Sequence, residues 1–226
     1  MGRGPYSSAA MTGAWDRPVE RATRLLLGLV LFGLALATLV QADLGLDPWN
    51  VFTQGLARQI GLSLGQTTVI VSVLLLLLWI PLGERPGVGT IANALIVGPV
   101  VDAGLAIIPA PDQLAGQVAY MVAAIVGTAI ATGLYVGAGW GPGPRDGLMT
   151  GLAARGVPIA FARAGIEITV LIVGWFLGGT VGVATVVFAL TIGPLVKVAL
   201  HRLAVRPAVP GRPSRRPRPT SPGGSG

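Results

Sequence analysis

Long apolar runs alternate along the chain with short intervals rich in glycine, proline and charged residues. Six of these runs cover residues 25–42, 66–82, 88–108, 114–137, 159–177 and 180–203. A helix rises about 1.5 Å per residue, so runs of this length can cross the hydrocarbon core of a bilayer, which is about 30 Å thick. The pattern therefore predicts an all-α integral membrane protein with six transmembrane helices.

The chain contains one unit twice. Residues 45–57 read GLDPWNVFTQGLA, and residues 141–153 read GPGPRDGLMTGLA, 96 positions later. After a slip of one residue the register continues, with the Gly98-Pro99 pair matching Gly193-Pro194. A repeat of this length predicts two copies of a single structural unit.

Each copy contains three of the six runs, and an odd number of crossings has a topological consequence. The second copy must enter the membrane from the opposite side, so the two copies are predicted to form inverted repeats. Their predicted bounds are residues 17–111 and 112–205. The segment 1–16 and the basic, Pro- and Arg-rich tail 206–226 are predicted to be disordered, and the tail to be cytoplasmic.

Composition and charge agree with a membrane protein. Of the 226 residues 52% are hydrophobic and only 11% charged, and the mean hydropathy is +0.73. The net charge of +7 does not indicate a nucleic-acid partner, because with both termini inside the cell all the basic residues except Arg58 fall at the inner ends of the runs. This bias predicts a multi-pass protein of the bacterial cytoplasmic membrane with both termini cytoplasmic.

The glycine-rich intervals of the two copies predict short helices that cannot span the membrane. Asp47 can cap a helix that begins at Pro48, and Gly143, Pro144 and Asp146 repeat this arrangement. With Arg145 beside it, such a helix start could hold an anionic group. The alternative is that each segment is only a tightly capped linker.

Two further features could belong to a substrate site. Arg163 and Glu167 lie four residues apart on one helical face, where they can form a binding pair or a structural ion pair. Proline and glycine within two matching runs predict a kink or break at the same depth in both copies, unless they serve packing alone. The predicted substrate-binding residues are Asn50, Arg145, Asp146 and Glu167, with helix breaks lining the site at Gly98, Pro99, Gly193 and Pro194. No catalytic residue, metal site or cofactor is predicted, and cysteine is absent.

Glycines also recur at spacings of four residues, which allow helices to approach closely. They are Gly133, Gly137 and Gly141, and then Gly174, Gly178 and Gly182. The close approach can occur within one chain or between copies in a homo-oligomer.

The segments around Gly45-Leu-Asp-Pro-Trp-Asn and Gly143-Pro-Arg-Asp-Gly resemble those of YczE-type bacterial membrane proteins, in the wider YczE/YyaS/YitT family. The resemblance covers roughly residues 20 to 204 and implies no catalytic residues. The function predicted is a small transporter or permease that acts on a small-molecule or ion substrate within the lipid bilayer. The alternative is a non-transporting accessory or assembly protein. An enzyme is not expected, because no membrane-embedded histidine, cysteine or paired carboxylate motif is available for acid–base or nucleophilic chemistry, and the single histidine, His201, is expected at the inner boundary of its run.

Overall fold

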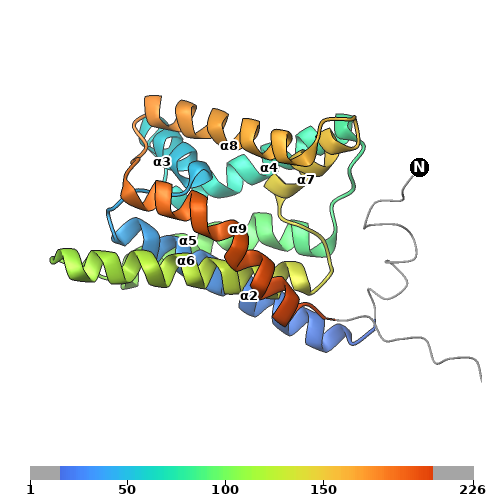
Figure 1. The fold of residues 1–226 in the computed structure, drawn as a ribbon, viewed down its shortest axis with the longest axis horizontal. Coiled ribbons are helices and arrows are strands. Elements are labelled where there is room, and N and C mark those ends of the chain that lie inside the picture. The colour runs from blue at the N-terminus through green and yellow to red at the C-terminus, as the bar shows by residue number, and fades with distance from the viewer. Residues whose placement is uncertain (1–15, 206–226) are drawn as a thin grey trace, which may run out of the picture. The chain divides into compact units, whose positions relative to one another are not determined.

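The computed structural model describes residues 16–205, which fold into helices without any strand. Six helices are long and apolar enough to cross a membrane. They are α2 (Pro18–Gln41), α4 (Leu64–Leu82), α5 (Val88–Ile107), α6 (Leu114–Gly137), α8 (Ile159–Phe176) and α9 (Val183–Leu203). Two short helices, α3 (Pro48–Ile60) and α7 (Pro144–Ala153), lie between them in the chain (Figure 1). The prediction of a six-span, all-α membrane protein is confirmed, whereas the predicted disordered segments lie outside the described residues, apart from Asp16.

The first span is longer than its apolar run suggests. Helix α2 begins at Pro18, seven residues before the run, and therefore includes Arg21 and Arg24. Arg21 is 4% exposed and donates to the carbonyl of Ala138 at 2.6 Å. Arg24 donates to the carbonyl of Leu203 at 2.5 Å. These two side chains satisfy carbonyl groups at the ends of α6 and α9, which have no partner inside their own helices.

Helices α2 and α6 pack against each other along the middle of the fold, with α5 against α2 and α9 against α6. The short helix α3 packs on α8, and α7 packs on α4. Each short helix therefore contacts a spanning helix from the other half of the sequence. The result is that the starts of α3 and α7 come to the interior, between the two halves.

Two backbone hydrogen bonds join the halves at matching positions. The N–H of Gly89 donates to the carbonyl of Trp140, and the N–H of Ala184 donates to the carbonyl of Leu44, both at 2.8 Å. The close approach needs glycine at Gly45, where φ is +105° and a Cβ would lie 2.4 Å from the backbone nitrogen of Gly182.

The small residues spaced by four serve packing inside the chain. A Cβ on Gly133 would lie 2.9 Å from that of Ala199 on α9, and one on Gly174 would lie 2.4 Å from the backbone of Phe52 on α3. Gly178, in contrast, has nothing near it. Most of the glycines at this spacing thus allow helices of the same chain to pack closely.

Neither helix is interrupted at the predicted positions, and the alternative, a kink, stays a prediction. Helices α5 and α9 run without interruption through Pro99 and Pro194. Both prolines are exposed on the outer side of their helices, and both helices retain the length needed to span a membrane. Gly98 is buried instead against the backbone of Gly65 on α4.

This contact belongs to a tight junction between α4 and α5. Asp102 on α5 accepts a hydrogen bond from the hydroxyl of Ser63 at 2.5 Å and another from the N–H of Gly65 at 2.7 Å. In the second half the matching positions hold Pro158, Ala160 and Lys197, which cannot form these bonds. Correspondingly, α8 and α9 hardly touch each other, and the space between them becomes part of the site described next.

Candidate functional site

The two short helices begin as the sequence predicts. Pro48 and Pro144 occupy their first turns, and the preceding Asp47 and Gly143 have extended backbones with ψ of 156° and 160°. Proline suits this position because its missing N–H would have no partner there in any case. The carboxylate of Asp47 does not cap its helix but accepts a hydrogen bond from the side-chain amide of Asn50 at 2.5 Å.

Arg145 joins the starts of the two short helices. One guanidinium nitrogen lies 3.6 Å from a carboxylate oxygen of Asp47, whose side chain is only 2% exposed. The guanidinium also lies over the ring of Phe32, 5.3 Å from its centre. A buried carboxylate needs such a partner, because removing an uncompensated charge from water is costly.

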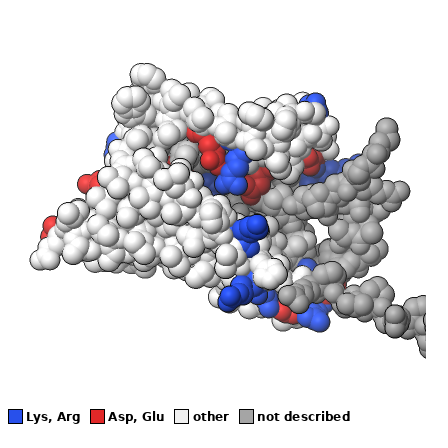
Figure 2. All heavy atoms as spheres, in the orientation of Figure 1, with Lys and Arg blue, Asp and Glu red and all other residues white. Residues whose placement is uncertain are grey.

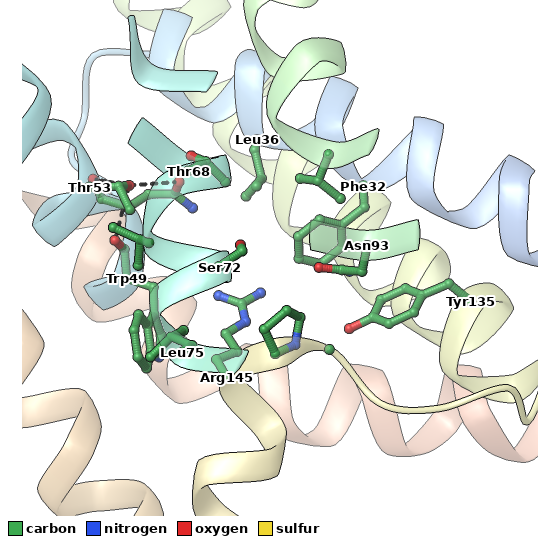
Figure 3. Close-up of a pocket in the computed structure, with 15 residues that line it drawn as sticks. Phe32, Leu36, Trp49, Thr53, Thr68, Ser72, Leu75, Asn93, Tyr135 and Arg145 are labelled. Atoms are coloured by element: carbon green, nitrogen blue, oxygen red, sulfur yellow. Dashed lines mark hydrogen bonds between the residues drawn. The ribbon is translucent and has the colours of Figure 1, made fainter. Parts of the chain in front are cut away.

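A cavity with few charges lies on one side of this ion pair, and we call it the neutral cavity. It encloses about 490 Å³, including its open mouth. Figure 3 shows Arg145 extending into it from α7, with Ser72 and Tyr135 on either side. Its polar lining residues are Asn50, Thr53, Thr68, Ser72, Asn93, Tyr135 and Arg145.

A second cavity also includes Arg145 in its wall and is lined by five charged side chains, and we call it the charged cavity. It encloses about 750 Å³, again with its open part. Its charged lining residues are Asp47, Arg145, Asp146, Arg163 and Glu167. Figure 2 shows acidic and basic side chains gathered in a hollow between α8 and α9, within a largely uncharged face.

The two cavities are lined by matching positions of the sequence repeat. Phe32 and Leu36 of the neutral cavity match Thr128 and Thr132 of the charged cavity, 96 residues later. Asn50 in the same way matches Asp146. At these three matching positions the second copy therefore has a polar or charged side chain, and the first copy has an apolar or neutral one.

The charges in the charged cavity are not fully balanced. Arg145 pairs with Asp47, and Arg163 pairs with Glu167 at 3.0 Å. Asp146 accepts a hydrogen bond from the N–H of Gly143 at 3.2 Å. No basic group of the described residues lies within ion-pair distance of it. Three carboxylates and two guanidinium groups thus line this cavity.

Two buried polar atoms in the wall of this cavity also lack partners among the described residues. They are the indole N–H of Trp49 and the hydroxyl of Thr128, on side chains that are 8% and 2% exposed. A buried polar group without a hydrogen bond is unfavourable by about 1–3 kcal/mol, so such groups usually have a partner.

The predicted site residues divide between the two cavities. Arg145 lines both, Asn50 lines the neutral cavity, and Asp146, Glu167 and Gly193 line the charged cavity. The other predicted lining residues, Gly98, Pro99 and Pro194, lie in neither wall. Asp47, Trp49 and Thr128 were not predicted as site residues. Asp47 could have been found because it stands directly before α3, as Gly143 stands directly before α7. Thr128 lies inside an apolar run, and the sequence around it gives no signal.

Comparison with known proteins places the chain in a family. Residues 19–201 match the model of a family of unknown function, DUF6198. The chain is 33% identical over 207 residues to an uncharacterised protein of Haemophilus influenzae, covering 91% of this chain and 95% of that protein. It is 32% identical over 187 residues to the uncharacterised membrane protein YczE of Bacillus subtilis, covering 80% and 86% respectively. No solved structure matches the chain. The chain therefore belongs to the DUF6198 family, as a relative of the membrane protein YczE.

Proposed function

We propose that this multi-pass membrane protein is a small inverted-repeat transporter whose substrate site lies where α3 and α7 begin. The observation that carries the proposal is the pair of cavities that share Arg145 in their walls and are lined by matching positions of the two halves. Inverted repeats in secondary transporters commonly place a substrate site between the copies, with helix N-termini directed toward it.

The contacts between the halves support a two-fold relation. The bonds from Gly89 to Trp140 and from Ala184 to Leu44 join matching positions in opposite directions. The packing of α3 on α8 and of α7 on α4 is reciprocal in the same way. Because each copy has three spanning helices, a two-fold axis relating them would lie in the plane of the membrane.

In this proposal the protein lies in the bacterial cytoplasmic membrane with both termini inside, as the distribution of basic residues favours. Its polar groups bind and release a solute and catalyse no covalent step. An accessory protein that assembles through small-residue faces has less support, because Gly133 and Gly174 already pack inside the chain.

Labelling of single cysteines tests the inverted topology, and the natural chain contains no cysteine that would interfere. Leu62 and Val157 are matching, exposed positions, 41% and 39% exposed. In sealed vesicles of one orientation, a membrane-impermeant thiol reagent should label Leu62→Cys and Val157→Cys from opposite sides. Labelling of both variants from the same side would overturn the inverted repeat.

A third cysteine tests transport without knowledge of the substrate. Thr132 lines the charged cavity, and a transporter must expose this cavity to each side in turn. Thr132→Cys should therefore react with the impermeant reagent added to right-side-out and to inside-out vesicles, whereas Ala37→Cys, at a fully buried position, should react in neither. Reaction of Thr132→Cys from one side only would overturn the transporter proposal.

A further inference from the structure

We infer that the neutral cavity binds a small uncharged amide, a solute that combines a carbonyl oxygen with an N–H group. The inference rests on the proposed function and assigns a substrate class to its site. It follows from three polar side chains that line this cavity and make no hydrogen bond to any described residue. They are Ser72 on α4, Asn93 on α5 and Arg145 on α7.

The hydroxyl of Ser72 is directed to the cavity although an internal acceptor is close to it in the chain. Hydroxyl side chains within a helix often donate to the carbonyl four residues earlier. Thr67 and Thr68 on the same helix do so, at 2.9 and 2.8 Å, whereas Ser72 does not. Its side chain is half-buried and lines the cavity. A solute in the cavity can therefore reach this hydroxyl.

Asn93 and Arg145 offer further groups to the same space. The amide of Asn93, also half-buried, has no hydrogen-bond partner within residues 16–205. Arg145 contacts Asp47 through one nitrogen at 3.6 Å and lies over the ring of Phe32, but its five N–H donors make no hydrogen bond in the described part of the chain. Figure 3 shows Ser72, Asn93 and Arg145 pointing into one space.

These groups differ from unpartnered atoms that are sealed inside the protein. The two buried polar atoms that are both enclosed and without a partner in the described residues belong to Trp49 and Thr128. Ser72, Asn93 and Arg145 have no hydrogen bond either, but their polar atoms retain accessible surface in the cavity. They come from three helices of both halves and can therefore bind one solute together.

The charges around the neutral cavity favour an uncharged solute. Arg145 is its only charged lining residue among those described, and Asp47 already balances that charge. An anion would place a second negative charge beside the same guanidinium, and a cation would be repelled by it. Both effects are strong at the low dielectric of a membrane interior.

The donors and acceptors of the wall select an amide among uncharged solutes. A guanidinium can only donate, so the solute must present an acceptor such as a carbonyl oxygen. The side chain of Asn93 presents both a carbonyl oxygen and an NH₂ group, and a solute amide presents the same two groups in return. The cavity volume of about 490 Å³, with its open mouth, lies in the range of small-molecule sites, about 300–1,000 Å³.

The test measures the thermal stability of the purified protein in detergent with four probes of nearly equal shape. Acetamide is the amide, acetone lacks the N–H, acetate is the anion and acetamidinium is the cation, with sodium chloride at matched ionic strength as the reference. A solute of this size binds at best with a Kd of about 40 µM, so the titrations extend to roughly a thousandfold above that value.

We expect acetamide to raise Tm in a saturable manner. Acetone should bind about fivefold more weakly, as the loss of one hydrogen bond implies, and the two ions should act no differently from sodium chloride. The absence of a saturable response to acetamide would overturn the inference and leave water as the occupant. Stabilisation by acetate or acetamidinium equal to that by acetamide would overturn it as well.

Three variants locate the effect. Ser72→Ala and Asn93→Leu remove groups that bond to nothing in the described chain, so they should leave the Tm of the ligand-free protein nearly unchanged while each weakens acetamide binding about fivefold or more. The control is Thr169→Ala on α8, which removes a hydroxyl outside the cavity that donates to the carbonyl of Gly165 and should leave acetamide binding unchanged. Unchanged acetamide binding in both cavity variants would contradict the assigned site.

This experiment and the labelling of Thr132→Cys can fail separately, because the labelling measures access to the charged cavity without any ligand. Acetamide binding with access from one side only would retain the ligand and overturn transport. Access from both sides without acetamide binding would retain transport and overturn the ligand.

Discussion

Replacing Gly147 by alanine tests the packing that holds the start of α7 against α4. A Cβ at this position would lie 1.9 Å from Cζ2 and 2.1 Å from Cε2 of the Trp79 ring. Trp79 is only 1% exposed, and its indole N–H donates to the carbonyl of Pro144 at 2.8 Å. The ring cannot move aside without disturbing that bond. Its acceptor residue, Pro144, immediately precedes Arg145 in the chain.

The expected loss of stability follows from three contributions. Overpacking of a well-packed interior destabilises by roughly 1–3 kcal/mol, and a lost hydrogen bond by about 1 kcal/mol. Alanine in place of glycine within a helix returns about 1 kcal/mol. The net destabilisation for Gly147→Ala is therefore roughly 1–3 kcal/mol, which for a chain of this size corresponds to a decrease in Tm of roughly 2–12 °C.

The measurement is thermal unfolding of the purified protein in detergent, followed by tryptophan fluorescence. The matched control is Gly165→Ala in α8, where a Cβ meets nothing within 4 Å, so that only the gain in helix propensity remains. We expect Gly147→Ala to melt below the unmodified protein and Gly165→Ala to melt at or above it. Equal melting of the two variants would refute the assigned contact between α7 and α4.

Three further changes have defined outcomes, two in the same unfolding assay and one in the yield of folded protein. Arg145→Met leaves the buried Asp47 carboxylate without its partner and should destabilise by about 3–5 kcal/mol. Adding Asp47→Asn should recover much of that loss, and no recovery would argue against a direct interaction between the two. Asp102→Asn replaces a carboxylate that holds the start of α4 and should destabilise by about 1–2 kcal/mol, so an unchanged Tm would contradict that role. Gly45→Ala places a Cβ against the backbone of Gly182 at a positive φ and should lower the yield of folded protein more than any of these, as measured by size-exclusion chromatography.

The sequence was sufficient to predict the spanning helices because the bilayer imposes a simple rule. An uninterrupted apolar run such as 114–137 must be helical at that depth, where backbone groups can be satisfied only internally. The start of α2 could not be predicted in this way. It depends on Arg21 and Arg24 reaching carbonyls of Ala138 and Leu203, more than 100 residues away, and no local pattern reveals such partners.

A break at the two prolines is absent, because a proline's effect on a helix depends on its surroundings, whereas the kink that the sequence also allows stays a prediction. Pro99 and Pro194 lie on the exposed side of α5 and α9, and both helices continue through them. A proline removes one backbone hydrogen bond, and a spanning helix can tolerate this through small local adjustments. The sequence alone indicates the residue and the depth, but not the direction in which it faces.

Apart from Asn50, the substrate-binding residues were predicted from their charge. Arg145, Asp146 and Glu167 are rare ionisable groups within or next to apolar runs, so each was a candidate from the sequence. From the sequence, Asp47 could be interpreted only as a helix cap. Its ion pair with Arg145 joins residues from opposite halves of the chain, and no local pattern shows it. Trp49 in its interval and Thr128 in its apolar run are uncharged, and the sequence does not show that the indole N–H and the hydroxyl are buried without a partner among the described residues.

The difference between the two halves indicates which part of the proposed transporter can change shape. Asp102 fastens α4 to α5 through Ser63 and Gly65, whereas Lys197 at the matching position provides no acceptor, and α8 hardly touches α9. Helices α8 and α9 are therefore not joined by hydrogen bonds like those of Asp102. The charged cavity can widen without breaking such bonds. Widening the neutral cavity by separating α4 from α5 would break the two hydrogen bonds that Asp102 accepts. Under the proposed function, movement of α8 relative to α9 is thus the less costly way to open the charged cavity.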